Sequence, residues 1–249
     1  MTGVRLRGRR ILITGASGAI GGAMAVQAAR AGADLFLTGR DPQRLAATTD
    51  RCRQAGASVD SVALDLLEDG AVDTLVAAAQ GFGRLNIIVL AAGLGLYAPL
   101  FSTSGSDFAD LLQTHVLGPH RLLSQLVTEL ERPAAIVAIS SISAVVPVSG
   151  FGAYSAAKAA LSAMATTLAI ELRPFHVRVL VVHPGPVRTP FFERASRPGL
   201  HESPDYGQMS VRPGYVAWRI WLALRLHQRN IYVFPGTRLL GLRGPVGRF

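Results

Sequence analysis

The stretch Arg10-Ile11-Leu12-Ile13-Thr14-Gly15-Ala16-Ser17-Gly18-Ala19-Ile20-Gly21 sets the fold class of this 249-residue chain. Its first five residues form a short apolar run that is typical of a buried strand. Glycines at 15, 18 and 21 then lead into an alanine-rich segment, 22–30, for which we predict a helix. A glycine-rich turn between a strand and a helix lets backbone N–H groups bind a phosphate at the helix N-terminus. The stretch therefore predicts a strand, a pyrophosphate-binding turn and a helix.

The alternation of strands and helices continues along the chain. We expect further strands at 34–38, 58–63, 87–90, 134–140, 177–182 and 231–234, and helices at 41–54, 68–80, 106–130, 154–172 and 216–226. Gly118-Pro119 is expected to interrupt the long helix at 106–130. Continuous apolar strands between helices indicate a parallel sheet covered on both faces. We predict a doubly wound α/β fold of about seven strands, with one domain spanning residues 1–249.

Composition argues against several classes of protein. The chain is 49% hydrophobic and 16% charged, which argues against disorder, and no apolar run is long enough to predict a membrane span. Thr14-Gly15 cuts the basic and apolar N-terminus short, so we do not expect a signal peptide. The single cysteine, Cys52, predicts no internal disulfide and no metal site. We expect a cytoplasmic protein.

The net charge of +9 invites a nucleic-acid hypothesis. The arginines are spread along the sequence without a dense basic run, so we expect no nucleic-acid partner. Two segments near the C-terminus stand out. The proline-rich stretch 186–213 is predicted to be a substrate lid. The tail 236–249 is rich in arginine and leucine, and we expect it either to contact a membrane surface, helped by Trp218 and Trp221, or to pack on a neighbouring subunit.

The end of the second strand indicates which dinucleotide the site prefers. In sites for NAD(H), an acidic residue there holds the ribose 2′-hydroxyl. This chain has Thr38-Gly39-Arg40 instead, so no carboxylate repels a 2′-phosphate and Arg40 can bind one bidentately. Ser17 adds a hydroxyl. We expect NADP(H), with NAD(H) as the alternative; the competing interpretation is that Arg40 merely precedes the helix cap at Asp41.

A second pattern surrounds the only lysine of the sequence, which stands beside 24 arginines. Tyr154 precedes Lys158 by four residues, so the two share one face of the predicted helix. A nearby cation favours the phenolate, and we therefore expect Lys158 to lower the pKa of Tyr154, as a general acid–base requires. Ser141 lies at the end of the preceding strand.

The glycine turn, the Ser141/Tyr154/Lys158 spacing and the Pro184-Gly185 turn together resemble the short-chain dehydrogenase/reductase family. The resemblance covers about residues 9–190 and extends loosely to about 235. It implies a Rossmann-like fold with seven parallel strands, and a homodimer or homotetramer. The many alanines of segment 154–172 suit close packing across such an interface.

The resemblance also implies roles for individual residues. Tyr154 would be the acid–base, Lys158 would bind the nicotinamide ribose and lower the tyrosine pKa, and Ser141 would bond the substrate oxygen. The expected cofactor contacts are Gly15, Ser17, Gly18, Ile20, Gly21, Arg40, Asp65, Leu66, Ala92, Gly93, Tyr154, Lys158, Pro184, Gly185, Val187 and Thr189.

Three departures from the family pattern stand out. Ala19 occupies a position where a glycine is expected. Ala91-Ala92-Gly93 replaces the turn Asn-Ala-Gly, which removes an amide that ties loops together. His115 replaces the helix asparagine that supports a water relay to the lysine. We expect His115 either to bond that water or to be a satisfied core histidine.

Together these patterns predict an NADP(H)-dependent oxidoreductase without a metal. It would transfer a hydride between nicotinamide and the carbonyl or secondary alcohol of an apolar small molecule, with Ser141, Tyr154, Lys158 and His115 as the catalytic set. Three apolar segments, 94–101, 145–151 and 191–209, would roof the substrate. The alternative is a catalytically weak dinucleotide-binding sensor or scaffold on the same fold, because both family asparagines are missing.

Overall fold

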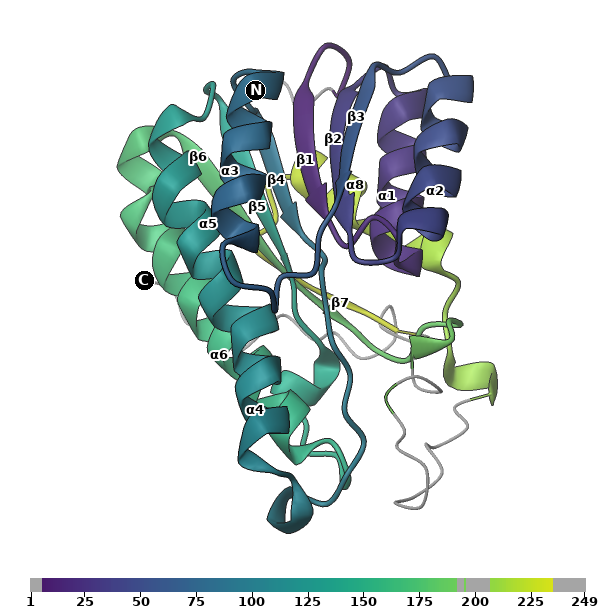
Figure 1. Ribbon diagram of the computed structural model, residues 1–249, viewed down its shortest axis with the longest axis vertical. Coiled ribbons are helices and arrows are strands. Elements are labelled where there is room, and N and C mark those ends of the chain that lie inside the picture. The colour runs from purple at the N-terminus through teal and green to yellow at the C-terminus, as the bar shows by residue number, and fades with distance from the viewer. Residues whose placement is uncertain (1–5, 192–194, 196–206, 235–249) are drawn as a thin grey trace.

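A computed structural model of the chain describes residues 6–191, 195 and 207–234, and its centre is a sheet of seven parallel strands (Figure 1). The spatial order of the strands is β3-β2-β1-β4-β5-β6-β7. The five inner strands are almost wholly buried, because both faces of the sheet are covered, whereas the edge strands β3 and β7 are partly exposed. The strands are β1 (Arg10–Thr14), β2 (Asp34–Gly39), β3 (Val59–Ala63), β4 (Ile87–Leu90), β5 (Ala134–Ile139), β6 (Val177–Pro184) and β7 (Asn230–Val233).

Helices form a layer on each side of the sheet (Figure 1). One layer contains α1 (Ala19–Arg30), α2 (Pro42–Gln54) and α8 (Pro213–Arg225); the other contains α3 (Ala71–Phe82), α5 (Gly118–Leu126) and α6 (Gly152–Glu171). Alternate strand residues point to opposite layers. Ile11 and Ile13 pack with the first layer, whereas Leu12 packs with the second. The α/β fold with helices on both faces of a seven-stranded parallel sheet is confirmed.

The order of the strands reverses between β1 and β4. From β1 the chain moves outward to β2 and β3 and then crosses back to place β4 on the other side of β1. Loops that follow neighbouring strands diverge at such a point, and ligands of open parallel sheets bind in the crevice that results. The predicted glycine turn follows β1 and so lies at this crevice.

The long helix predicted at 106–130 is not interrupted at Gly118-Pro119, and that part of the prediction is wrong. The backbone stays helical through α4 (Gly105–Leu112), a π-helical turn at Gln113–Leu117 and α5. Gly118 donates its N–H to the carbonyl of Gln113, five residues back. Proline lacks an N–H and, in a regular α-helix, clashes with the carbonyl four residues before it. The wider π turn spaces the backbone hydrogen bonds further apart at that position, so Pro119 fits without a break in the helix. His115 lies within the turn.

The predicted start of the second helix is confirmed to the residue. Asp41 caps α2, since its carboxylate accepts a hydrogen bond from the backbone N–H of Arg44 at 2.9 Å, and Pro42 is the first helical residue.

On α6, Ala156 and Ala163 face solvent, where the predicted homo-oligomer would pack. The tail 236–249 lies outside the described residues, as does half of the predicted lid. None of the helices within the described ranges is long and apolar enough to cross a bilayer.

Candidate active site

A cleft of about 990 Å³ runs along the carboxyl edge of the sheet. It is lined by Ser141, Tyr154 and Lys158 and by every residue predicted to contact the cofactor. His115 is the exception among the predicted site residues, because it lies behind Gly93 and does not line this cleft. With Phe234, which follows β7, the structure brings residues from the ends of all seven strands to one cavity.

The glycine turn at one end of the cleft has no space for side chains. Gly15 has φ +68°, and a Cβ at this residue would lie 2.5 Å from the carbonyl oxygen of Ala91. A Cβ at Gly21 would overlap the carbonyl oxygen of Gly15. Backbone N–H groups at the start of α1 are therefore open to a ligand, and the turn fits a pyrophosphate.

Arginines line the end of the cleft where the adenosine of the predicted cofactor is expected. The predicted Arg40 is exposed at the end of β2, and Arg44 and Arg51 of α2 line the same end. Sequence reasoning missed these two, although 44, 47, 48 and 51 recur with helical spacing and all line the cleft. Thr38 also lines this end, and its hydroxyl oxygen is buried without a partner among the described residues. This end fits a nucleotide that carries extra negative charge.

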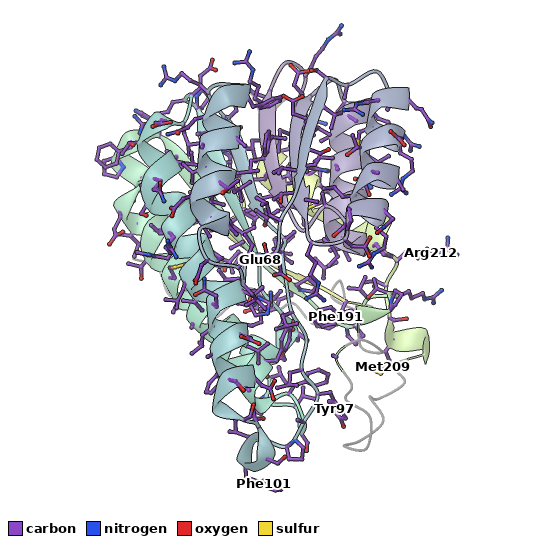
Figure 2. All side chains as sticks on the ribbon, in the orientation of Figure 1. Glu68, Tyr97, Phe101, Phe191, Met209 and Arg212 are labelled. Atoms are coloured by element: carbon purple, nitrogen blue, oxygen red, sulfur yellow. The ribbon has the colours of Figure 1, made fainter. Side chains whose placement is uncertain are left out.

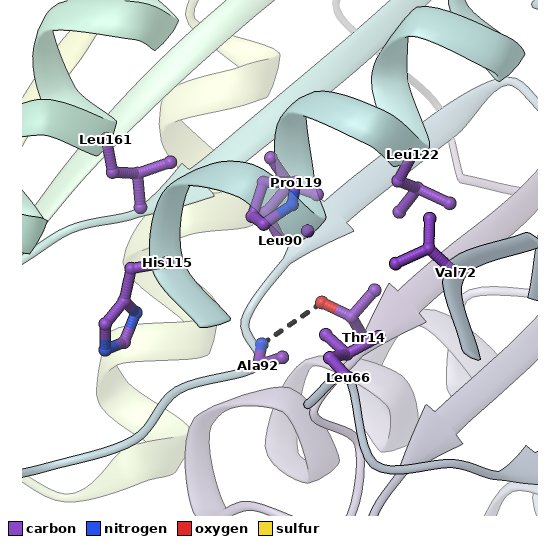
Figure 3. A pocket seen from close by; sticks show the side chains of 10 residues that line it. Thr14, Leu66, Val72, Leu90, Ala92, His115, Pro119, Leu122 and Leu161 are labelled. Carbon is purple, nitrogen blue, oxygen red and sulfur yellow. Dashed lines mark hydrogen bonds between the residues drawn. The ribbon is translucent and has the colours of Figure 1, made fainter. Parts of the chain in front are cut away.

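Thr14 fixes the turn in which the family asparagine is missing. Its hydroxyl oxygen accepts the backbone N–H groups of Ala91 and Ala92, each at 3.1 Å, and donates to the Val89 carbonyl at 3.3 Å. Figure 3 shows the Thr14–Ala92 bond, with His115 beside the same turn. The loop after β4 is therefore held without the asparagine amide.

Ser141 and Tyr154 lie close together in the cleft. Ser141 follows β5, and Tyr154 belongs to the first turn of α6; both line the cleft, and the Ser141 side chain is near enough to the phenol to lower its pKa. Ser143 supports the pair, because its hydroxyl donates to Ser141 Oγ at 2.9 Å and its backbone N–H approaches the same oxygen at 3.2 Å. Tyr154 is 8% exposed. A substrate oxygen at this point of the cleft would meet both hydroxyls.

Lys158 is buried one helical turn beyond Tyr154, with 4% of its surface exposed. Its ammonium donates to the Ile139 carbonyl at 2.8 Å and lies 5.7 Å from the centroid of the Tyr154 ring. No carboxylate within the described residues pairs with it. Burial lowers the pKa of Lys158 to about 7. The lysine can therefore exchange a proton near neutral pH.

The expectation that Lys158 lowers the pKa of Tyr154 is wrong in this structure. Burial raises the pKa of Tyr154 well above its ordinary value, and the hydrogen bond from Ser141 offsets only part of that rise. The phenolate loses its hydration in this pocket, and at the high pH where the phenol ionises Lys158 is already neutral and offers no compensating charge. Tyr154 is therefore held in its protonated form.

His115 is 1% exposed and lies edge-on to Tyr154, with ring centroids 5.6 Å apart. Its Nε2 is 2.7 Å from the carbonyl oxygen of Leu94, so Nε2 carries the proton. Nδ1 is then a buried acceptor without a partner in the described part of the chain. Burial, followed by the charge of Lys158, holds the His115 pKa well below its ordinary value. The imidazole is neutral.

Aromatic rings form the substrate side of the cleft. Phe151 and Phe191 lie 5.9 and 5.8 Å from the Tyr154 ring, and Tyr97 packs on Phe151 at 4.9 Å. Figure 2 shows Tyr97, Phe191 and Met209 in the lower half of the view, where loops that follow the strands gather. On this aromatic side of the cleft, the described lining residues carry no charge. The predicted roofing segments do contribute, through Leu94, Gly95, Val148, Phe151, Phe191 and Met209.

The remaining wall follows β6. Pro184, Gly185, Val187 and Thr189 all line the cleft, and Val187 pairs with Val211 in an isolated parallel bridge. Gly185 lies close to Phe234, since a Cβ there would lie 2.7 Å from Phe234 Cβ. Among the described residues, no three histidine, cysteine or acidic side chains gather as a metal site would need.

Comparison with known proteins gives consistent matches. A family model for short chain dehydrogenases matches residues 9–198. The human protein dehydrogenase/reductase SDR family member 2, mitochondrial, is 33% identical over 189 residues, which are 75% of this chain and 68% of the human protein.

Solved structures match over nearly the whole chain. An alcohol dehydrogenase from Thermococcus sibiricus, complexed with 5-hydroxy-NADP, has a TM-score of 0.80 and 27% identity, over 91% of this chain and 96% of its own. A short chain dehydrogenase/reductase from Burkholderia phymatum, in complex with NAD, has a TM-score of 0.81 and 25% identity, over 92% and 90%. These structures hold different dinucleotides, so they do not decide the cofactor.

Proposed function

Because the chain belongs to the short-chain dehydrogenase/reductase family and is an NAD(P)-dependent oxidoreductase, we propose that it transfers a hydride between NADP(H) and the carbonyl or secondary alcohol of an apolar small molecule. One observation carries the proposal. The side chains of Ser141 and Tyr154 lie together beside a buried Lys158, in a cleft whose other end is a glycine turn. An acid–base group and a dinucleotide site therefore share one cavity.

The dinucleotide would lie along the carboxyl edge of the sheet. Gly15, Gly18 and Gly21 would bind its pyrophosphate through the backbone, and Asp65 and Leu66 would border the adenine. Arg40, with Arg44 and Arg51 beside it, supports a preference for the 2′-phosphate of NADP(H). When bound, the nicotinamide supplies or accepts the hydride.

Ser141 and Tyr154 would act on the substrate oxygen. Both hydroxyls can donate to a carbonyl oxygen and polarise it, and Ser143 orients Ser141 for that contact. Burial keeps Tyr154 protonated, which is the form that can give a proton to the oxygen as it becomes an alcohol. The raised pKa therefore supports a proton donor in carbonyl reduction.

Lys158 and His115 would support the tyrosine. Lys158 has its pKa near neutrality, so it can pass a proton toward Tyr154 as well as hold the cofactor ribose. The unpartnered Nδ1 of His115 is an acceptor near that ammonium, which supports a water-bonding role over that of a satisfied core histidine. Both residues face Gly93: a Cβ there would lie 3.2 Å from His115 Cε1 and 4.0 Å from Lys158 Nζ.

NADPH and NADH oxidation with a panel of aliphatic and aromatic ketones and aldehydes tests the proposal. We expect turnover with NADPH, and in Tyr154→Phe a loss of about 10²–10⁴-fold in kcat with little change in cofactor Kd. Tyr215→Phe, on the exposed face of α8, is the matched control and should keep its activity. Cofactor binding without turnover across the panel would instead favour the sensor or scaffold.

A further inference from the structure

His183 forms a hydrogen bond that no motif in the sequence indicates. It is the second-last residue of β6 and is 4% exposed. Its Nδ1 lies 3.2 Å from the carbonyl oxygen of Ser141. The ladder between β5 and β6 runs up to Ser140, whose N–H donates to the Val182 carbonyl at 2.8 Å. At Ser141, one residue after Ser140, the His183 imidazole contacts the carbonyl in place of a backbone N–H from β6.

The chemistry of this contact fixes the state of the ring. A carbonyl oxygen only accepts, so Nδ1 must carry the proton. Burial lowers the pKa of His183, although its bonds with Ser141 and with the Asn230 side chain oppose that effect. At neutral pH the ring is therefore neutral, with its proton on Nδ1.

The last strand holds the ring in place. His183 is directly opposite Tyr232 in the register of β6 and β7, and the two rings stack at 4.8 Å with an angle of 17° between their planes. The side chain of Asn230, two residues earlier on β7, lies beside the same imidazole and opposes the lowering of its pKa. β7 therefore orients a donor that is aimed at the loop after β5.

Apart from the His183 contact, the side-chain bonds between that loop and its neighbours run to α6. Lys158 Nζ donates to the Ile139 carbonyl at 2.8 Å, and Ser140 Oγ donates to the Lys158 carbonyl at 3.0 Å. Neither bond links the loop to β6, whose continuation forms the wall at Pro184 and Gly185. Of the side-chain bonds in the described part of the chain, the one from His183 connects Ser141 to that wall.

We propose that His183 is a positioning residue that sets Ser141 against the nicotinamide side of the cleft through the Ser141 carbonyl. The proposal rests on the proposed function, since it assigns Ser141 a contact with the substrate oxygen. A misplaced donor costs turnover much more than cofactor binding, because the cofactor is held mainly at the other end of the cleft.

The test compares two substitutions. His183→Phe keeps a ring to stack on Tyr232 but removes the donor, and we expect kcat to fall about tenfold with NADPH Kd within about twofold of wild type. His183→Asn restores an N–H near the position of Nδ1 and should recover most of that loss. His120→Phe, the same change at an exposed histidine of α5, is the control and should keep its kcat.

A double-mutant cycle with Ser141→Ala separates positioning from general damage. If His183 acts through Ser141, His183→Phe changes kcat by less than about twofold in the Ser141→Ala background. An undiminished loss in that background, or an unchanged kcat in His183→Phe itself, would overturn the proposal.

A spectroscopic measurement keeps the inference independent of turnover. If wild type and Tyr154→Phe prove equally inactive, the proposed function fails while the His183 bond can still be examined. ¹⁵N NMR of labelled histidine, assigned by the signal lost in His183→Asn, should show the Nδ1-protonated tautomer for His183. The Nε2-protonated form would contradict the bond, and with it the positioning role.

Discussion

The two ends of the cleft are built in different ways. At the dinucleotide end, Gly15 and Gly21 present bare backbone in a turn with no room for a side chain, and the arginines around it are exposed or half-buried. At the reacting end, Tyr154, Lys158 and His115 are buried titratable side chains, and burial shifts the pKa of each. The first end depends on shape that residue spacing encodes. The second depends on an electrostatic environment that only the folded chain creates.

Gly15→Ala should give the largest effect and should damage the dinucleotide end. The alanine would have to adopt a left-handed backbone conformation, and its Cβ would overlap the Ala91 carbonyl. We therefore expect a loss of about 3–4 kcal/mol in the free energy of unfolding. Urea denaturation measures it. Gly56→Ala is the matched control, because Gly56 has φ +91° and nothing within 4 Å; it should cost only about 1–2 kcal/mol. Equal losses would mean that close packing does not define this end.

Lys158→Met should reveal how much free energy of unfolding the burial of the Lys158 ammonium costs at the reacting end. Native Lys158 has a pKa of about 7, against the ordinary 10.5 expected in the unfolded chain. Between these values the unfolded state binds more protons, so the contribution of Lys158 to stability rises with pH. Relative to Lys158→Met, wild type should gain about 2 kcal/mol between about pH 7 and pH 9.

Denaturant unfolding at several pH values measures this difference. Arg225→Met, at an exposed arginine in the last turn of α8, is the control and should show no such trend. A stability difference between wild type and Lys158→Met that stays flat with pH would show that the ammonium is not desolvated as its burial indicates.

Arg40→Ser should change the dinucleotide end without touching the reacting end. Loss of a charge-assisted bond to the 2′-phosphate is expected to raise NADPH Kd about tenfold or more, with NADH Kd nearly unchanged. Arg53→Ser, on the same helix layer but away from the cleft, is the control. Fluorescence titration measures both constants, and equal weakening of the two dinucleotides would remove the basis for an NADP(H) preference.

His115→Asn should have the smallest effect. Asparagine offers a donor and an acceptor, so it can bond the Leu94 carbonyl or a water near Lys158, and we expect kcat to stay within about tenfold of wild type. His115→Leu offers neither and should lose more. A collapse of His115→Asn to the level of Tyr154→Phe would show that the imidazole itself takes part in the reaction.

Much of the fold follows from the sequence because its signals are local. The apolar runs predicted at 87–90 and 231–234 fall on β4 and β7 within one residue. The glycine turn and the cap at Asp41 depend on neighbouring residues alone. Helix α4–α5 could not be predicted in the same way, because a proline after a glycine ordinarily signals a break, and the π turn that avoids it leaves no pattern in the sequence.

In the candidate site too, features set by local sequence could be predicted, whereas features set by the packed fold could not. Residue spacing was enough to select Ser141, Tyr154 and Lys158 for one cavity, but the pKa of Tyr154 was predicted in the wrong direction because its burial is a property of the packed fold. Arg44 and Arg51 were missed although their helical spacing was available. His183 gave no signal, since its contact with Ser141 depends on two strands that are distant in sequence.

The π turn at Gln113–Leu117 has a consequence for how this segment evolves. One extra residue in a helical turn rotates all that follows by about 100° around the axis. The turn thus sets the phase between Leu111 of α4, which packs with the aromatic cluster, and Leu122 of α5, which packs with the sheet. Substitutions change which side chain stands at position 115. Only an insertion or deletion changes which position faces the tyrosine, so a change in the length of this helix would move residue 115 away from the Tyr154 ring.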